Sequence, residues 1–109
     1  MRTLFMRCLQ ASVLAGLTLP AVMQAESDPA TIFKTNCVLC HSANGSGDSS
    51  TGKALHAKDL RSPEIQKQSD EDLVAAITKG KGKMPSFGAK IKPDDMKKLV
   101  AYIRELPKK

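Results

Sequence analysis

The sequence is poor in aromatic side chains. Its 109 residues include no tryptophan, one tyrosine and three phenylalanines. A chain of this length forms one small domain, and small domains bury a smaller fraction of their surface than large ones do. We therefore expect that the side chains of this chain make only a thin core by themselves.

The sequence also has no apolar run of the roughly 20 residues that a membrane-spanning helix needs. Its most apolar stretch, Leu9 to Leu19, follows a start with two arginines and no acid, and Pro20 ends it. This order is typical of a secretory signal peptide, and we expect cleavage after Ala25. An uncleaved signal anchor is the alternative, but the shortness of the run and Pro20 argue against it.

Cleavage there divides the chain into a signal peptide, 1–25, and one mature domain, 26–109. Cys8 precedes the apolar stretch, so it is not placed for lipid attachment and leaves with the signal. Removing Arg2 and Arg7 from the 17 basic residues leaves 15 of them against 11 acidic ones, a mildly basic domain. We expect a periplasmic protein without stable membrane insertion.

The two cysteines of the mature domain lie in the stretch Cys37-Val38-Leu39-Cys40-His41. At this spacing both thiols can add to the vinyl groups of one haem while the imidazole reaches its iron. The pattern predicts one haem c, bound covalently through Cys37 and Cys40, with His41 as an iron ligand. A buried porphyrin would also supply the apolar mass that the side chains lack.

Two other kinds of site use a pair of cysteines at this spacing, namely a redox-active disulfide and half of a zinc site. A zinc site would need two more ligands, and His56 is the one histidine outside the motif. A redox disulfide would leave His41 without a role. The haem interpretation accounts for the cysteines and the histidine together.

A methionine in a restrained loop is the candidate for the second axial ligand. Pro85 disfavours helix at Met84, so the thioether can be directed inward from the loop 81–88. Methionine and histidine together are the axial ligands of cytochromes c. Met96 competes for this role but falls on the apolar face of the next helix, and His56 is more simply a solvent-facing side chain.

Start and stop signals predict an all-helical chain. Pro29 behind Asp28 starts a helix that runs into the haem motif, and the glycines and serines of 42–52 indicate an irregular loop. Further helices are predicted for 63–67, for 70–79 with Gly80 ending it in the left-handed conformation, and from Pro93 to a point before Pro107. The apolar face of the last helix is expected to pack on the first helix and its Phe33.

The mature sequence resembles the class I c-type cytochromes, of the small bacterial kind, over nearly its whole length. Cys37, Cys40 and His41 match the haem attachment motif of that family, and Met84 matches its sixth ligand. The stretch 99–103 is similar to its C-terminal helix, whose aromatic residue, Tyr102 here, packs against the N-terminal helix at a position matching Phe33. The resemblance implies a small cytochrome c fold, all-α, with three to five helices wrapped around one covalently bound haem.

The sequence departs from the family at Gly52-Lys53, where many relatives have a proline after the glycine. The carbonyl of that proline accepts the proton of the ligating histidine. We expect the Lys53 carbonyl to accept it from His41, with less rigidity than a proline would give.

The resemblance implies one-electron transfer between larger redox proteins. With His41 and Met84 on the two axial positions there is no open site for a substrate, so we do not expect an enzyme. Two alternatives remain open. A five-coordinate haem without Met84 would suit a gas sensor or a peroxidase, and the chain could instead be the haem subunit of a larger oxidoreductase complex.

Basic side chains surround Met84 in the sequence, with no acid between the first and the last of them. They are Lys79, Lys81, Lys83, Lys90 and Lys92. In the resembled family electrons leave on this side, so these lysines are expected to dock on an acidic surface of a redox partner. The simpler alternative is a solvated surface. No aromatic platform lies among the charges, so no nucleic acid is expected. We expect a monomer.

Overall fold

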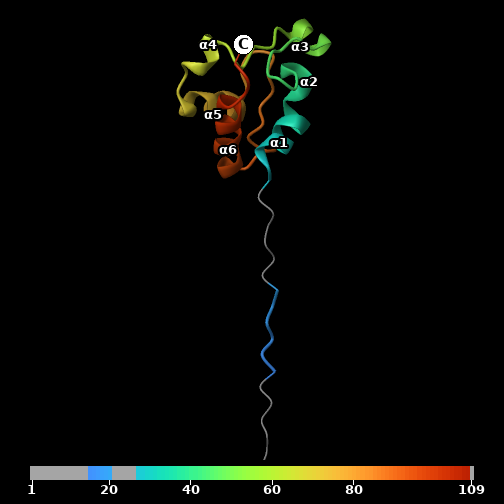
Figure 1. The fold of residues 1–109 in the computed structure, drawn as a ribbon, viewed down its shortest axis with the longest axis vertical. Helices are drawn as coiled ribbons and strands as arrows, with labels where there is room; N and C mark the ends of the chain where they lie inside the picture. Colours follow the sequence, from blue (N-terminus) through green and yellow to red (C-terminus); the bar gives the residue numbers. More distant parts are fainter. Residues whose placement is uncertain (1–14, 21–26, 109) are drawn as a thin grey trace, which may run out of the picture.

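The structure is a computed structural model, and it describes residues 15–20 and 27–108. Six helical segments make up the fold (Figure 1). They are α1 (Pro29–Asn36), α2 (Val38–His41), α3 (Ser50–Leu55), α4 (Pro63–Gln66), α5 (Asp70–Lys79) and α6 (Pro93–Arg104). These described residues contain no strand, only one isolated bridge between Lys81 and Met84. The predicted all-α class is confirmed.

The starts of the helices follow the signals in the sequence. The Asp28 side chain accepts a hydrogen bond from the backbone N–H of Thr31 at the start of α1, and Ser69 does the same for Asp72 at the start of α5. Proline stands at the beginning of α1, α4 and α6, where its missing N–H has no cost. Local sequence therefore fixes where these elements begin.

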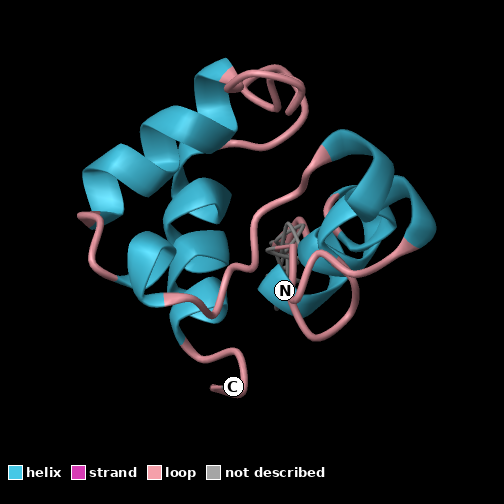
Figure 2. Cartoon of the chain, turned by 90° about the horizontal axis from the view of Figure 1, so that it is seen from above, coloured by secondary structure: helices cyan, strands magenta, loops and turns pink. Residues whose placement is uncertain are grey.

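The core lies where α6 meets α1 and α5. Met96, Leu99 and Val100 of α6 are at most 1% exposed. The ring of Tyr102 packs on Phe33 of α1 with the ring centroids 5.3 Å apart and the planes at 48°, as predicted. In Figure 1, α4, α5 and α6 lie on one side and α1, α2 and α3 on the other, and Figure 2 shows the chain connecting the two groups between them.

Three details differ from the sequence-based expectations. The first helix ends at Asn36, and Cys37, with φ −114° and ψ −32°, is the cap between α1 and α2, so α2 is a separate turn. Within the expected loop 42–52, Ser49 caps a helix that begins at Ser50, because its side chain accepts from Gly52 N–H. These two changes bring the count to six segments, two of only four residues. Gly80 has a φ of 77° but a ψ of 165°, which is not the left-handed helical conformation.

None of the described helices is both long enough and apolar enough to cross a membrane. The predicted signal peptide and its cleavage site fall largely outside the described residues, as does Cys8.

Candidate haem site

The two cysteines of the motif lie at either end of the turn that opens α2. Cys37 is buried and Cys40 is partly buried, and both are free thiols. Burial raises the pKa of the Cys37 thiol to about 11, with a smaller contribution from Cys40 beside it. Redox-active Cys-x-x-Cys pairs instead need a thiol of lowered pKa. The surroundings of Cys37 therefore disfavour the redox-disulfide alternative.

The imidazole of His41 is oriented by a backbone carbonyl. Its Nδ1 lies 2.9 Å from the carbonyl oxygen of Lys58. Because a carbonyl can only accept, Nδ1 must carry the proton, which leaves Nε2 with the lone pair that a metal needs. The expectation that the Lys53 carbonyl accepts this proton was wrong. Lys53 is inside α3, where its carbonyl accepts from the N–H of His56.

Helix α3 packs tightly against the motif. The Ser49 hydroxyl donates to the carbonyl of Leu39 at 2.7 Å and accepts from Gly52 N–H at 2.9 Å. A Cβ on Gly52 would lie 2.1 Å from the carbonyl oxygen of Cys40, so only glycine fits there. Gly47 N–H donates to the carbonyl of His41 at 2.8 Å. The attachment turn is thus fixed by backbone contacts on one side.

Met84 lies at the end of a tight turn. Its N–H and carbonyl both pair with Lys81, at 2.9 Å and 3.1 Å. The following stretch returns to α5, since Phe87 N–H donates to the carbonyl of Ile77 at 3.0 Å. A Cβ on Gly80 would lie 2.7 Å from the Met84 carbonyl oxygen, which explains the glycine at that position. Met84 is partly buried and packs against the apolar core. Backbone hydrogen bonds therefore define the turn that carries Met84.

The competing residues occupy other positions. Met96 is 1% exposed in the core beside Leu99, and His56 is exposed. Among residues 15–20 and 27–108, no group of three or more histidine, cysteine or acidic side chains is placed to hold a metal ion.

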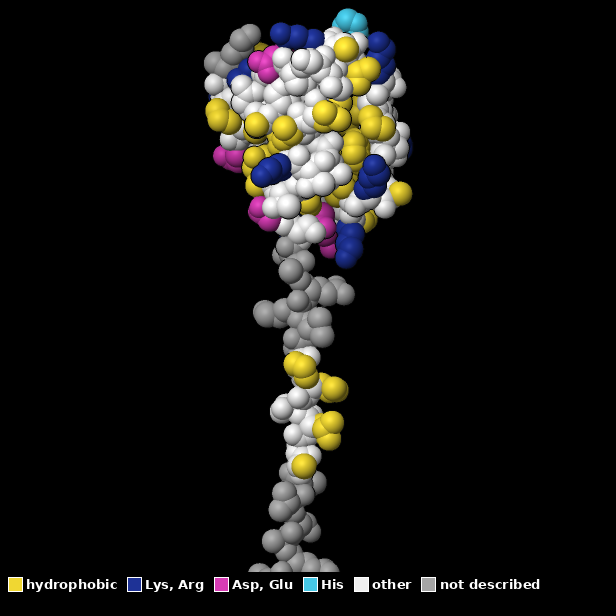
Figure 3. Space-filling model, turned by 90° about the vertical axis from the view of Figure 1, so that its right-hand side faces the viewer, with side chains coloured by type: hydrophobic (Ala, Val, Ile, Leu, Met, Phe, Trp, Pro, Cys, Tyr) yellow, Lys and Arg dark blue, Asp and Glu magenta, His cyan; other side chains and the backbone are white. Residues whose placement is uncertain are grey.

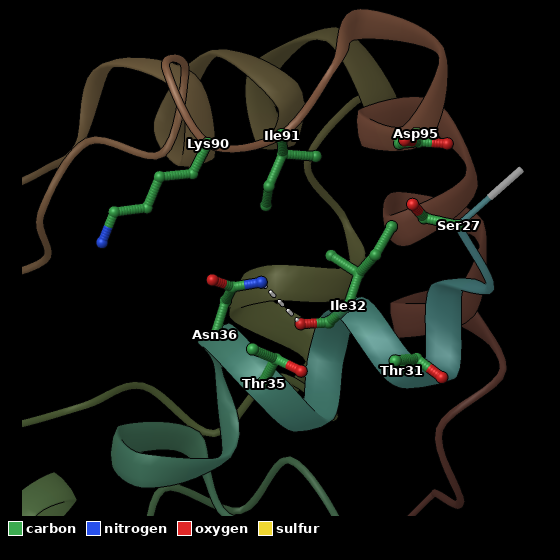
Figure 4. Close-up of a pocket in the computed structure, with 8 residues that line it drawn as sticks. All are labelled: Ser27, Thr31, Ile32, Thr35, Asn36, Lys90, Ile91 and Asp95. Atoms are coloured by element: carbon green, nitrogen blue, oxygen red, sulfur yellow. Dashed lines mark hydrogen bonds between the residues drawn. The ribbon is translucent and has the colours of Figure 1, made fainter.

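The surface has a polar groove that is separate from this motif. It has a volume of about 230 Å³ and lies between α1 and the chain before α6 (Figure 4). Thr31, Thr35 and Asn36 form one wall, where Asn36 Nδ2 donates to the carbonyl of Ile32 at 3.0 Å. None of the predicted haem ligands lines the groove.

The donor set fits haem c chemically. It comprises two thiols, an imidazole whose Nδ1 lies against a carbonyl oxygen, and a thioether that a short turn carries. These are the groups that covalent attachment and axial ligation require. The sequence analysis singled out these four residues as candidates, but it did not identify the Lys58 carbonyl, because any residue type can supply a backbone acceptor. The Gly52 contact with the motif was also missed, although the glycine itself is visible.

Comparison with known proteins agrees with this chemistry. A sequence family described as "Cytochrome C oxidase, cbb3-type, subunit III" matches residues 24–103. Cytochrome c6 of Microcystis aeruginosa is 36% identical over 76 residues, which are 70% of this chain and 90% of that protein. Cytochrome c6 of a Nostoc species is 33% identical over 84 residues, 77% of this chain and 73% of that protein.

Solved structures of c-type cytochromes have the same fold. The KustC0563 c-type cytochrome superposes with a TM-score of 0.69 at 30% identity and covers 76% of this chain and 100% of its own. Cytochrome c6C from Synechococcus sp. PCC 7002 superposes with a TM-score of 0.56 at 27% identity, covering 72% and 93%. The chain therefore belongs to the c-type cytochromes, within the family of cbb3-type cytochrome c oxidase subunit III, and is an electron-transfer protein with covalently bound haem c.

Proposed function

We propose that Cys37 and Cys40 carry the haem c, that His41 and Met84 are its axial ligands, and that the protein shuttles single electrons between larger redox proteins in the periplasm. The hydrogen bond from His41 Nδ1 to the Lys58 carbonyl carries this proposal. It fixes the tautomer in which Nε2 can bind a metal. No such bond would be needed for a histidine that merely lies on the surface.

Haem, when bound, supplies one iron that changes oxidation state by a single electron. The chain contributes the environment. The Met84 thioether is a soft donor that favours the reduced state, and the apolar core against which it packs penalises additional charge. With both axial positions occupied by side chains, the protein has no open position for a substrate. This agrees with electron transfer instead of catalysis.

We propose further that residues 1–25 are a cleaved signal peptide and that 26–109 is the mature cytochrome domain. The family match begins at residue 24, next to the proposed cleavage site, which supports this division. The mature N-terminus and the haem can be measured together. Intact mass after denaturation should equal the chain from Glu26 plus one haem.

The lysines around Met84 are proposed to dock transiently on an acidic surface of the redox partners, with the protein acting as a monomer. All five are exposed. They are Lys79, Lys81, Lys83, Lys90 and Lys92. Lys58, Arg61 and Arg104 form ion pairs in the described chain, and none of the five lysines belongs to these pairs. On the face drawn in Figure 3, Lys and Arg side chains lie at the surface among Asp and Glu side chains and scattered groups of hydrophobic side chains. Such a surface suits fast, short encounters.

The axial pair is tested by comparing two methionines. Met84→Ala should abolish the sulfur-to-iron charge-transfer band of the ferric protein, lower the reduction potential and open the iron to carbon monoxide. Met96→Ala is the control. It should keep the band but destabilise the fold by about 2–5 kcal/mol, because Met96 is buried in the core. The reverse pattern would assign the ligand to Met96.

Docking is tested by measuring the second-order rate of electron transfer to the native partner at increasing ionic strength. The wild-type rate should fall with salt, because charges are screened beyond about 8 Å at physiological ionic strength. Lys81→Glu with Lys83→Glu should be slower at low salt and converge with wild type at high salt. Lys34→Glu with Lys67→Glu makes the same change of net charge at exposed positions far from Met84 in sequence. An equal effect of both pairs would mean that only net charge matters.

The description of the matched family favours a second candidate function, that of a haem subunit in a larger oxidase complex. Purification from the native source distinguishes the two. A free carrier should elute alone at the mass of one chain, whereas a subunit should elute with fixed partners in constant proportion.

A further inference from the structure

The Lys58 carbonyl that orients His41 belongs to the short loop 56–61, between α3 and α4. A lysine has none of the rigidity of a proline, so other contacts must hold its carbonyl in position. The contacts on either side of Lys58 show how this is done.

Before Lys58, the backbone is fixed by the end of α3. His56 has a left-handed backbone, with φ 56° and ψ 42°, and Ala57 N–H donates to the carbonyl of Gly52 at 2.8 Å. A Cβ on Gly47 would lie 2.7 Å from the Ala57 carbonyl oxygen and 3.1 Å from that of Lys58. The backbone that precedes Lys58 therefore has little room to move.

After Lys58, an ion pair closes the loop. Arg61 donates to Asp59 through two parallel bonds, from Nε at 3.0 Å and from Nη2 at 3.1 Å. The Asp59 carboxylate also accepts from the backbone N–H of Arg61 at 2.9 Å. The two side chains are only 13% and 24% exposed. A bidentate pair of this kind holds the two side chains in a defined geometry, and it is also a strong interaction.

The neighbouring ion pair differs in kind. Lys58 Nζ lies 3.2 Å from Glu64 Oε1, with both side chains 62% exposed. An exposed single contact contributes little to structure. The Lys58 side chain therefore has a minor role, whereas its carbonyl is the group that touches His41.

We propose that Asp59 and Arg61 are a positioning pair, which holds the Lys58 carbonyl on His41 Nδ1 and thereby sets the reduction potential of the protein. This inference rests on the proposed function of His41 as an axial ligand. A strong hydrogen bond at Nδ1 makes the imidazole a better electron donor, which favours the oxidised state. Loosening the carbonyl weakens the bond, so the potential rises.

The decisive variants change Arg61. Arg61→Lys keeps the positive charge but loses the bidentate geometry, so the potential should rise although net charge is unchanged. In Arg61→Gln a purely electrostatic effect would lower the potential, since a cation is lost, whereas loosening of the carbonyl raises it. The two explanations thus predict opposite signs. Lys67→Gln is the control, because it removes an exposed cation outside this loop and should not raise the potential.

A second readout follows the hydrogen bond itself. In the reduced, diamagnetic protein, the exchange of the His41 Nδ1 proton with solvent can be followed by NMR. Exchange should be faster in both Arg61 variants than in wild type and in Lys67→Gln. A potential that is unchanged in Arg61→Lys, or lowered in Arg61→Gln, overturns the proposal. So does a raised potential with unchanged proton exchange.

The same preparations separate this proposal from the proposed function. If wild-type protein shows no six-coordinate low-spin spectrum, the axial assignment fails before any variant is measured. If that spectrum is present and the Arg61 variants leave potential and exchange unchanged, the axial assignment stands and the positioning role of the pair is wrong.

Discussion

Helices α1, α5 and α6 pack on one another through apolar side chains, whereas hydrogen bonds hold together the attachment segment, 38–64. Every buried hydrophobic residue of the described chain lies outside 38–64. Val38 and Leu60, its main apolar contributions, are only partly buried. The segment instead uses contacts such as Leu60 N–H to the Gly45 carbonyl at 2.8 Å.

This difference shows that the two parts are stabilised in different ways. The helical part needs no cofactor to explain its packing, since its side chains already exclude water from one another. The attachment segment has well-defined backbone geometry around His41 but no core of its own. A small domain of this kind depends on what it binds. We infer that haem supplies the apolar contacts that the segment 38–64 lacks, and that the helical part depends on haem less.

The largest effect is expected from Cys37→Ser with Cys40→Ser, which removes covalent attachment. The chain should lose most of its stable tertiary structure, and amide hydrogen exchange should lose protection first and most completely in 38–64. Residual protection should remain in α6, where the buried side chains gather. Hydrogen exchange followed by mass spectrometry, on this variant and on wild type, tests the difference.

A uniform result would weaken the comparison between the two parts. If the double variant melts cooperatively near the wild-type temperature, haem contributes little to the core. If protection is lost equally in α6 and in 38–64, the molecule folds as one unit, and the division into two parts has no thermodynamic meaning.

The helical part should be sensitive to loss of side-chain volume. Phe33→Ala removes a ring that is 1% exposed and packs on Tyr102 of α6. We expect a loss of about 3–5 kcal/mol, the range for a buried phenylalanine. Denaturant unfolding of the haem-loaded protein measures it. Phe33→Leu, which fills most of the space, should lose clearly less, and equal losses would mean that packing volume is not the cause.

How far the sequence predicts each part follows from the same division. Caps and apolar spacing located α5 and α6, because those signals are local and strong. The pairing of Phe33 with Tyr102 was also predicted. In the attachment segment the candidate ligands were proposed from residue type, and the first residues of α3 were taken for loop. Its short, serine- and glycine-rich sequence has no apolar stripe to mark it.

The Lys58 carbonyl shows why the remainder could not be predicted. The acceptor for His41 is a backbone group, so any residue type can provide it. Its place depends on the left-handed His56 and on the contact with Gly47, neither of which follows from local propensity. The expectation of Lys53 came from matching a glycine in the sequence, and the structure shows that this glycine instead packs against Cys40.

The attachment segment should be sensitive to added volume instead. Gly52→Ala puts a Cβ 2.1 Å from the Cys40 carbonyl oxygen and 2.5 Å from that of Gly47, so backbone must move. We expect a loss of about 1–3 kcal/mol, the range for overpacking, together with a lower yield of haem attachment. Gly82→Ala is the control, since nothing lies within 4 Å of its Cβ and only its φ of 58° opposes the change. Attachment should be normal in that control.

The smallest expected effect concerns Asp48, which organises the loop between α2 and α3. Ser42 Oγ donates to Asp48 Oδ1 at 2.9 Å, and hydrogen bonds from Ser46 and then from Ser42 lower the pKa of Asp48 below its ordinary value of 3.8. A carboxylate whose pKa is lower in the folded than in the unfolded protein stabilises the fold above the unfolded pKa. This contribution is lost as the pH falls through the lowered value.

Asp48→Asn removes that contribution, so the variant should melt slightly below wild type at pH 7, and the difference should shrink as the pH falls below about 3.8. Measuring wild type and variant side by side cancels the titration of other groups, which is common to both. The effect is small because the side chain is exposed and water screens it. A difference that stays constant between pH 7 and pH 3 would show that the shape of the Asp48 side chain matters to the loop, and its charge does not.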